Sequence, residues 1–581
     1  MKNNAHPPKP RFALSVGIIG HRPNRLPEDS RSRIAREIAE TLAAIRTETL
    51  AAHARHANCF SEFAPKLTLV AALAEGADRM AAEAALGLGF ELEAPLPFAA
   101  DEYEKDFDSH TSRTSFRRFL DKARAVLELD GDRMQAGKSY ATAGLIVLDM
   151  SDLLIAVWDG GAAHGRGGTT ELIAEAGRRG MPIIRVDATG QNLPRLHWRG
   201  LDDRHTTPMH IDDHPAAALG EALATAIDAQ IRPPQNSAER SGLDRFLAEG
   251  RRRLTARIEY PLLMFLLGVR WPRAGDILVP QPERLADVLS ATRSGASATI
   301  AAFGWADAIA VRFAQDFRCA VIANFLVSAV AVLVAVLNFP YPWSAVELVL
   351  VTFLVVNALV GYKRRWHHRW IESREVAERL RVAAPMHALA TRAPGPFGTA
   401  PAWPAWYARA ISREAGLRGG RLDKEGLAAA RQELQALLRD QAAYHEITAQ
   451  RFKRLHGRLA LVGLSLFIAA FLLSVGAFAA IAFRLLSVTP DMKYWMIVAS
   501  ASLPAFASAG YGIRMIGDFE GAAKRSARMK AQLDALASSI EKGGAEFEWL
   551  RDRAHKASDV ILGDVANWRL AVESRELEMP G

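Results

Sequence analysis

The chain has 581 residues, half of them apolar, and carries a formal net charge of +8. A chain of this length exceeds what a single hydrophobic core organises, so we expect several structural units. Its two cysteines, Cys59 and Cys319, lie far apart in the sequence, which excludes a disulfide framework and fits a reducing cytoplasm.

Residues 11–230 alternate short apolar runs with amphipathic stretches. Residues 12–19 form a β-branched run that ends at Gly20, and residues 30–51 have the periodicity of a helix. Further strand and helix signals follow, with strands predicted over residues 67–73, 90–96, 153–157 and 182–186. This alternation predicts an N-terminal α/β domain, with a Rossmann-like, mostly parallel sheet and helices on both faces.

Three turns that contain glycine follow strands or begin helices in this domain. Parallel sheets bind ligands beyond the carboxyl ends of their strands, where free backbone amides and an arginine suit a phosphate. We predict that the three turns meet at one sheet edge and bind a phosphorylated ligand. The predicted ligand-binding residues are Gly17, Gly20, His21 and Arg22 in the first turn, Glu75, Gly76, Asp78 and Arg79 in the second, and Asp159, Gly160, Gly167, Gly168, Thr169 and Glu171 in the third.

Each of these features also has a purely structural explanation. Gly17 and Gly20 can serve a tight turn, and acidic residues in a first helical turn, such as Asp78, stabilise the helix dipole. His53 and His56 lie three residues apart on a predicted helix, but no third ligand is evident, so no metal site is predicted.

Four segments of this region, GIIGHR, LAEGADR, SDLLIAVWDG and GRGGTTELIAEA, resemble the SLOG superfamily. This is the Rossmann-like fold shared by the DprA/Smf proteins and the Lonely Guy phosphoribohydrolases. The resemblance covers about residues 12–190 and implies a nucleotide-type ligand, such as an NAD-like or ADP-ribose-like compound or a cyclic oligonucleotide. It implies phosphate contacts for Gly20, Arg22, Gly76, Gly167, Gly168 and Thr169.

The third turn departs from the PGGxGTxxE pattern of the Lonely Guy enzymes. No proline precedes the turn, and Glu171 follows Thr169 by two residues instead of three. This difference favours a domain that binds its ligand without hydrolysing it, and no further cofactor is predicted.

Residues 231–295 are expected to form a linker and a helical connector, because prolines interrupt their pattern. The apolar run at residues 260–269 is too short to cross a bilayer, so a buried or interfacial helix is expected there.

Four long apolar runs follow, at residues 319–337, 343–362, 459–482 and 494–513. Each is long enough to cross a bilayer, and a segment in lipid must satisfy its own backbone hydrogen bonds, so each is predicted to be a transmembrane helix. The alternative is that they are buried helices of a large soluble protein. The predicted units are a first hairpin with flanking helices at 296–392, a loop linker at 393–421, and a second hairpin with flanking cytoplasmic helices at 422–581.

Basic residues flank the same end of all four runs, as with Arg318, Lys363, Arg458 and Arg514. The positive-inside rule then places both termini and the middle segment in the cytoplasm. Much of the positive charge is explained by this orientation and by anionic lipid, so the lipid bilayer is expected as a partner and no direct contact with nucleic acid is expected.

The segments AQRFKRLHGRL and DFEGAAKRSARMKAQLDAL, which flank the second hairpin, resemble the SLATT membrane effectors found fused to SLOG sensors in bacterial conflict systems. This resemblance implies a homo-oligomer in the bacterial inner membrane that opens a pore when its ligand binds, in antiphage defence or abortive infection. Two alternatives remain open. One is a membrane-tethered nucleotide hydrolase that uses Glu171, Asp159 or Glu75, and the other is a non-catalytic scaffold.

Overall fold

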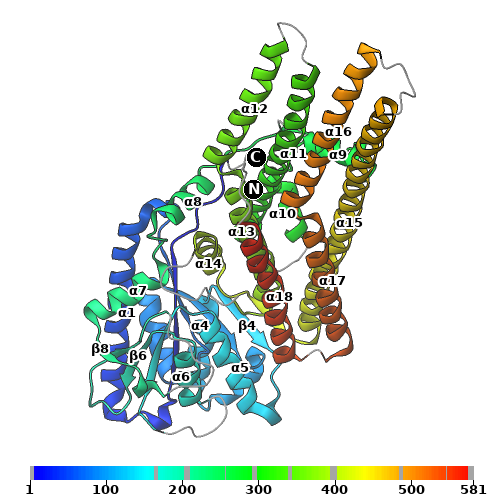
Figure 1. The fold of residues 1–581 in the computed structure, drawn as a ribbon. Coiled ribbons are helices and arrows are strands. Elements are labelled where there is room, and N and C mark those ends of the chain that lie inside the picture. Colours follow the sequence, from blue (N-terminus) through cyan, green and yellow to red (C-terminus); the bar gives the residue numbers. More distant parts are fainter. Residues whose placement is uncertain are drawn as a thin grey trace.

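The computed structural model describes residues 5–161, 168–201, 210–255, 257–290, 297–337, 343–392, 402–482, 489–544 and 546–573. An α/β domain lies at one end of the molecule, and long helices extend from it to the other end (Figure 1). This architecture confirms the predicted fold class, a Rossmann-like sheet domain followed by a helical region with four long apolar helices.

The sheet has nine strands in the order β8-β7-β6-β5-β1-β2-β3-β4-β9. Strand β1 pairs in parallel with β2 on one side and with β5 on the other, so the direction of strand succession reverses beside β1. Open parallel sheets bind ligands at such a reversal, beyond the carboxyl ends of the strands. The strands are β1 (Ala13–Gly20), β2 (Lys66–Val70), β3 (Glu91–Leu96), β4 (Ala125–Leu129), β5 (Leu153–Trp158), β6 (Ile183–Asp187), β7 (Arg195–His197), β8 (Ala216–Ala218) and β9 (Gly420–Leu422).

Strands β1, β2 and β5 are buried along almost their whole length, because helices cover both faces of the sheet. Val16 and Ile18 of β1 share a core with α1 and α2, whereas Leu154 and Ala156 of β5 share a second core with α5 and α6. The helices of this domain are α1 (Glu28–His56), α2 (Ala77–Gly87), α3 (Ala100–Tyr103), α4 (His110–Lys122), α5 (Ala136–Asp149), α6 (Thr169–Arg178) and α7 (Gly220–Ile231).

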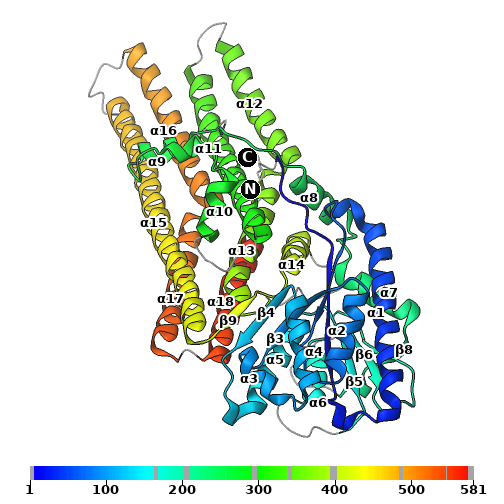
Figure 2. The ribbon, with the colours of Figure 1, turned by 180° about the vertical axis from the view of Figure 1, so that it is seen from behind.

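The helical region forms two hairpins that stand side by side in both views (Figures 1 and 2). Three shorter helices lead into it from the sheet domain, and α18 returns along the sheet side of the bundle. The helices are α8 (Ser237–Leu247), α9 (Glu259–Leu266), α10 (Pro282–Ser290), α11 (Ser297–Leu337), α12 (Trp343–Arg364), α13 (Trp366–Ala388), α14 (Trp403–Ala415), α15 (Lys424–Ala482), α16 (Pro490–Gly517), α17 (Phe519–Lys542) and α18 (Phe547–Glu573).

Four of the described helical segments are long and apolar enough to cross a membrane, and they contain α11, α12, α15 and α16. Their outward faces carry large apolar side chains that are about two-thirds exposed, such as Leu348 (67%) on α12 and Phe471 (66%) on α15. A soluble protein rarely exposes so large an apolar surface, which weighs against buried helices of a soluble protein. The chain is therefore a membrane protein.

The two hairpins share an asymmetry. Their first helices, α11 and α15, run unbroken for 41 and 59 residues, so both extend far beyond the roughly 20 residues that a bilayer requires. Their second helices are each broken by one residue in the left-handed conformation, Arg365 (φ +49°) between α12 and α13, and Asp518 (φ +43°) between α16 and α17.

The segment predicted as a loop linker at 393–421 differs from expectation in its described part. Residues 403–415 form α14, and residues 420–422 form β9, which pairs in parallel with β4 at the edge of the sheet. Two tryptophans of this segment are buried and hold it to the sheet domain and to α8. The Trp406 Nε1 donates to Ile231 O at 2.9 Å, and the Trp403 amide donates to Glu239 at 2.7 Å. Pro404 is compatible because it occupies the first turn of its helix.

The helical region is joined to the sheet domain through two buried carboxylates, Asp149 and Asp152. Asp152 precedes β5 and lies 2.7 Å from Nε of Arg413 on α14, with Arg409 and Arg392 at 3.7 and 3.9 Å. Burial alone would raise the pKa of Asp152, but the three arginines lower it below its ordinary value.

Asp149, at the end of α5, pairs with Arg551 of α18 and accepts a hydrogen bond from Thr391 at 2.7 Å. Both carboxylates therefore attach the helices to the edge of the sheet at which its parallel strands begin. The carboxyl ends of those strands lie at the opposite edge.

We predict that Asp152→Ala destabilises the protein by about 3–5 kcal/mol, because it leaves the buried Arg413 without its counter-ion. Thermal unfolding in detergent measures this effect. The matched control is Glu83→Ala, which removes a solvent-exposed partner of Arg118 and is expected to cost less than about 1 kcal/mol. Equal effects of the two substitutions would contradict the role assigned to Asp152.

Candidate functional site

The three predicted turns meet at the carboxyl ends of β1, β2 and β5. His21 follows β1, and its Nε2 lies 3.0 Å from Oδ1 of Asp159, which follows β5. The amide of Ala77, at the start of α2, donates to the carbonyl oxygen of His21 at 3.4 Å. The sheet topology thus brings together segments that are more than 50 and 130 residues apart in the sequence, at the reversal between β1 and β5.

Asp159 is the centre of a hydrogen-bonded cluster. It accepts from Arg25 Nη2 at 2.6 Å and from the Gly161 amide at 2.9 Å, in addition to its contact with His21. Partial burial acts to raise its pKa, but these hydrogen bonds prevail and lower the pKa of Asp159 to about 2. Asp159 is therefore a carboxylate throughout the physiological range and orders the basic groups around it.

Arg22 is a cation of this edge that a ligand can reach, since its side chain is 46% exposed. Its Nη2 lies 3.5 Å from Asp106, and its guanidinium carbon lies 5.1 Å from the centre of the Tyr140 ring. Asp106 also pairs with Arg133 and accepts from the Tyr140 hydroxyl, so its charge is shared among three donors. This arrangement leaves Arg22 oriented and able to bind an anion.

The second turn has mainly structural contacts. Asp78 is buried and accepts from the Ala74 amide at 3.2 Å, which closes the turn before α2. Arg79 donates to the Leu73 carbonyl at 3.1 Å and to Ser112, and its guanidinium packs on Phe107. Glu75 accepts from the Ser112 hydroxyl. These contacts fix the turn against α4.

The glycines allow the turns to pack closely. Gly76 has φ +97°, and a Cβ there would lie 2.6 Å from the carbonyl oxygen of His21. A Cβ on Gly20 would lie 2.5 Å from that of Ala77, and one on Gly17 would lie 2.6 Å from Ser151 Oγ. Packing accounts for these three glycines. Gly17 lies deeper in the sheet than the carboxyl ends of β1, β2 and β5, which we name the ligand edge after the predicted site.

The third turn is described only in part. Gly160 (φ +84°) follows Asp159, and Gly168 caps the start of α6, where Thr169 and Glu171 occupy the first turn. Thr170 accepts from Trp158 Nε1 at 3.0 Å, which holds the start of α6 beside the end of β5. The predicted residue Gly167 lies outside the described residues.

The histidines considered as a metal pair have other partners. His56 contacts Asp228 at 2.9 Å, and His53 packs edge-on against Phe12. Within the parts of the chain that the structure describes, no group of three or more His, Cys, Asp and Glu side chains is placed to hold a metal ion.

Sequence analysis missed Arg25, Asp106 and Tyr140. Tyr140 belongs to α5 and reaches the ligand edge because α5 follows β4, and the prediction did not include β4. The segment AVLEL contains a single polar residue, Glu128, and is only five residues long, so its sequence signal for a strand is weak. The alternation of residues 125–129 was nevertheless the signal available to detect it.

We predict that Gly76→Ala destabilises the sheet domain by about 1–3 kcal/mol, because a Cβ there would be strained at φ +97° and would push against His21. The control is Gly87→Ala at the end of the same helix, where a Cβ meets nothing within 4 Å and is expected to stabilise by about 0.5–1 kcal/mol. Thermal unfolding of both variants decides the matter, and a neutral Gly76→Ala would show that the two turns do not pack as described.

The titration of Asp78 gives a second prediction. Burial raises the pKa of Asp78 to about 7, so the folded state binds a proton that the unfolded state releases near pH 4. Wild-type stability should therefore fall as the pH rises from about 4 to 7. Asp78→Asn, which keeps an acceptor for the Ala74 amide, should be more stable than wild type by about 2–4 kcal/mol at pH 8 and nearly equal to it at pH 4. Melting curves at the two pH values test this, and a pH-independent difference would contradict it.

No protein-family model and no curated protein sequence matches this chain, so its function must be inferred from the geometry of its own residues.

Proposed function

We propose that this protein is a membrane effector that binds a nucleotide-type ligand at the carboxyl edge of its sheet and responds by opening or assembling a membrane pore. The observation that carries the proposal is the direct contact between α5, which begins at the ligand edge, and α18, which follows the second hairpin. In this proposal both termini are cytoplasmic and the protein lies in a bacterial inner membrane.

Helix α5 spans the sheet domain from one edge to the other. Tyr140 in its first turns packs on Arg22, and Asp149 at its end pairs with Arg551 of α18. Between these points, the Thr142 hydroxyl donates to Glu548 of α18 at 3.0 Å. A ligand that draws Arg22 toward a phosphate changes the packing of Tyr140, and α5 can transmit that change to α18.

Helix α18 in turn packs against α13 and α17, the inner helices of the two hairpins. Arg569 of α18 lies 2.9 Å from Glu375 of α13. A displacement of α18 therefore acts on both hairpins, through the helix that follows the left-handed residue of each. Four spans per subunit enclose little space, so a pore requires several copies of the chain, and we propose a homo-oligomer.

The resemblances to SLOG sensors and SLATT effectors supply the biological context of this proposal, antiphage defence or abortive infection. Ligands that fit the phosphate chemistry of the edge include NAD-like and ADP-ribose-like compounds and cyclic oligonucleotides. The proposal does not depend on which of them is the natural one.

The alternative of a membrane-tethered nucleotide hydrolase requires a carboxyl group that exchanges protons beside the ligand. Asp159 is held as a carboxylate, Glu75 is bonded to Ser112, and Asp78, whose pKa lies near neutrality, is buried below the turn. The geometry of these three carboxyl groups favours binding over hydrolysis. For Glu171, the remaining candidate, the argument is its spacing, because it follows Thr169 by two residues instead of the three of the Lonely Guy pattern. A non-catalytic scaffold would not need α5 to transmit a change from the ligand edge to α18.

The test is release of trapped dye from liposomes that contain the full-length protein, measured with a panel of NAD, ADP-ribose, adenine nucleotides and cyclic oligonucleotides. We expect one compound to trigger release and Arg22→Glu to raise the concentration required by at least about tenfold, because a carboxylate would replace the accessible cation. The control is Arg118→Glu, which changes the same charge on the outer face of α4 at a similar exposure of 49%.

Other outcomes separate the alternatives. If a compound binds and is cleaved but never triggers release, the hydrolase is supported and the pore is excluded. If no compound in the panel stabilises the protein or triggers release, the scaffold is supported. An equal loss in both arginine variants would show that Arg22 has no specific role.

A further inference from the structure

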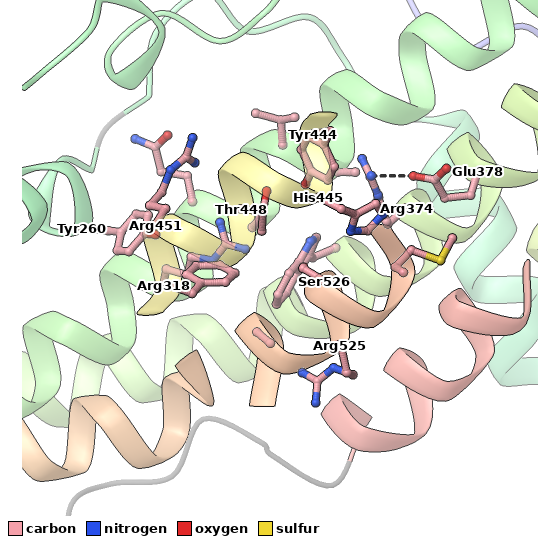
Figure 3. Close-up of a pocket in the computed structure, with 18 of the residues that line it drawn as sticks. Tyr260, Arg318, Arg374, Glu378, Tyr444, His445, Thr448, Arg451, Arg525 and Ser526 are labelled. Carbon is pink, nitrogen blue, oxygen red and sulfur yellow. Dashed lines mark ion pairs between the residues drawn. The ribbon is translucent and has the colours of Figure 1, made fainter. Parts of the chain in front are cut away.

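A cavity of about 330 Å³ lies between the two hairpins, at the inner end of the membrane helices. Its walls come from α9, α11, α13, α15, α17 and α18, and Figure 3 shows its polar side chains. Arg318, on α11, directly precedes the apolar run that begins at Cys319, so the cavity lies where the first span leaves the membrane.

The cavity lining carries more cations than anions. Five arginines and three carboxylates line it, namely Arg270, Arg318, Arg374, Arg451 and Arg525, with Asp276, Glu378 and Asp564. Asp276 pairs with Arg270, and Glu378 pairs with Arg374 and Arg381. Burial raises the pKa of Asp564 and so disfavours its charge. The carboxyl groups of the lining therefore do not neutralise all of its arginines, and the cavity carries a net positive charge.

Arg525 pairs with Asp518 at 2.9 Å, so Arg318 and Arg451 are the two lining cations that remain. Among the described residues, neither has a hydrogen bond or an ion pair with a carboxylate. The Arg318 guanidinium lies between the rings of Tyr260 and Trp370, at 5.5 and 5.0 Å. Figure 3 shows Arg318, Arg451 and Tyr260 together on one side of the cavity, away from the pair of Arg374 and Glu378. Two arginines on one side of a cavity, neither with a carboxylate partner, favour binding of an anion with several oxygens.

An apolar chamber of about 90 Å³ adjoins this cationic cavity. The two spaces share Tyr260, Arg318 and Trp370, and the chamber extends toward the spans between Val321 of α11 and Ile513 of α16. A site with arginines at one end and apolar walls toward the membrane matches a molecule with an anionic head and a hydrocarbon tail.

We infer that this cavity binds a phosphate group through Arg318 and Arg451, and that an anionic phospholipid of the surrounding bilayer supplies it, with part of an acyl chain in the apolar chamber. A soluble phosphate compound offers the same head chemistry without the tail. This inference is independent of the ligand edge of the sheet and of pore opening, because the cavity is built by the helices and its occupancy can be measured in a closed protein.

The test is native mass spectrometry of the full-length protein in detergent, titrated with phosphatidylglycerol, phosphatidylcholine and inorganic phosphate. We expect one tightly bound phosphatidylglycerol per chain, whose dissociation constant rises about tenfold to a hundredfold in the double variant Arg318→Gln, Arg451→Gln. The matched control is Lys363→Gln, Arg454→Gln, which removes the same charge from exposed positions beside the spans but outside the cavity, and is expected to change binding less than about twofold.

A second pair of variants keeps both arginines and so avoids a general loss of folding. Thr448 lines the cavity one helical turn before Arg451. Thr448→Glu places a carboxylate beside Arg451 and should displace the lipid, whereas Thr448→Gln, of similar size, should retain it.

Each outcome decides part of the inference. Inorganic phosphate binding as tightly as phosphatidylglycerol would keep the phosphate site and exclude the lipid as its source. Equal binding of phosphatidylglycerol and phosphatidylcholine, or equal affinity in the double variant and its control, would overturn the proposal. So would loss of binding in Thr448→Gln as large as in Thr448→Glu.

Discussion

The buried carboxylates Asp149 and Asp152 are the constraint on which the rest of the molecule depends. A carboxylate removed from water is costly unless cations and donors surround it, and here every nearby cation except Arg179 comes from the helical region. The sheet domain therefore completes its own core only when α14 and α18 are in place. Strand β9 also ties the helical region to the sheet. It lies between the two hairpins in the sequence, and it pairs with β4 at the edge of the sheet. Head and membrane region form one folded body rather than two domains on a tether.

The attachment of the helices at one edge of the sheet separates the candidate ligand site from the membrane-spanning helices. The basic and glycine-bearing turns occupy the carboxyl edge of the sheet, and the helices attach at the opposite edge, so β1 and its neighbours place roughly 25 Å between them at about 3.3 Å per residue. A signal between the two edges must pass through the elements that reach both. Helix α5 does so with Tyr140 at one end and Asp149 at the other, and it contacts α18 between them.

Much of this architecture could be predicted from the sequence, because the strongest signals are local. The apolar runs that begin at Cys319 and Leu459 are long enough to cross a bilayer core, and the rhythm of β-branched runs and helices indicates a parallel sheet. The convergence of the turns at His21 and Asp159 also followed from the topology that such a rhythm implies. What could not be predicted depends on distant partners. Trp403 and Trp406 resemble loop residues until Ile231 and Glu239 are beside them, and Arg79 resembles a ligand residue until Ser112 accepts its hydrogen bonds. The ligand-binding roles of the turn residues, Gly167 included, stay predictions.

The left-handed residues Arg365 and Asp518 divide each return helix at the same place in its hairpin, just after the span. Side chains other than glycine are uncommon in this conformation, at a cost of about 1–3 kcal/mol each that the surrounding packing must offset. The rods α11 and α15 carry no such interruption in their described length. Each hairpin thus pairs one continuous helix with one helix that is interrupted at a left-handed residue. At that residue a small rotation of the sheet domain would be converted into a larger displacement of the far end of the membrane-spanning helix.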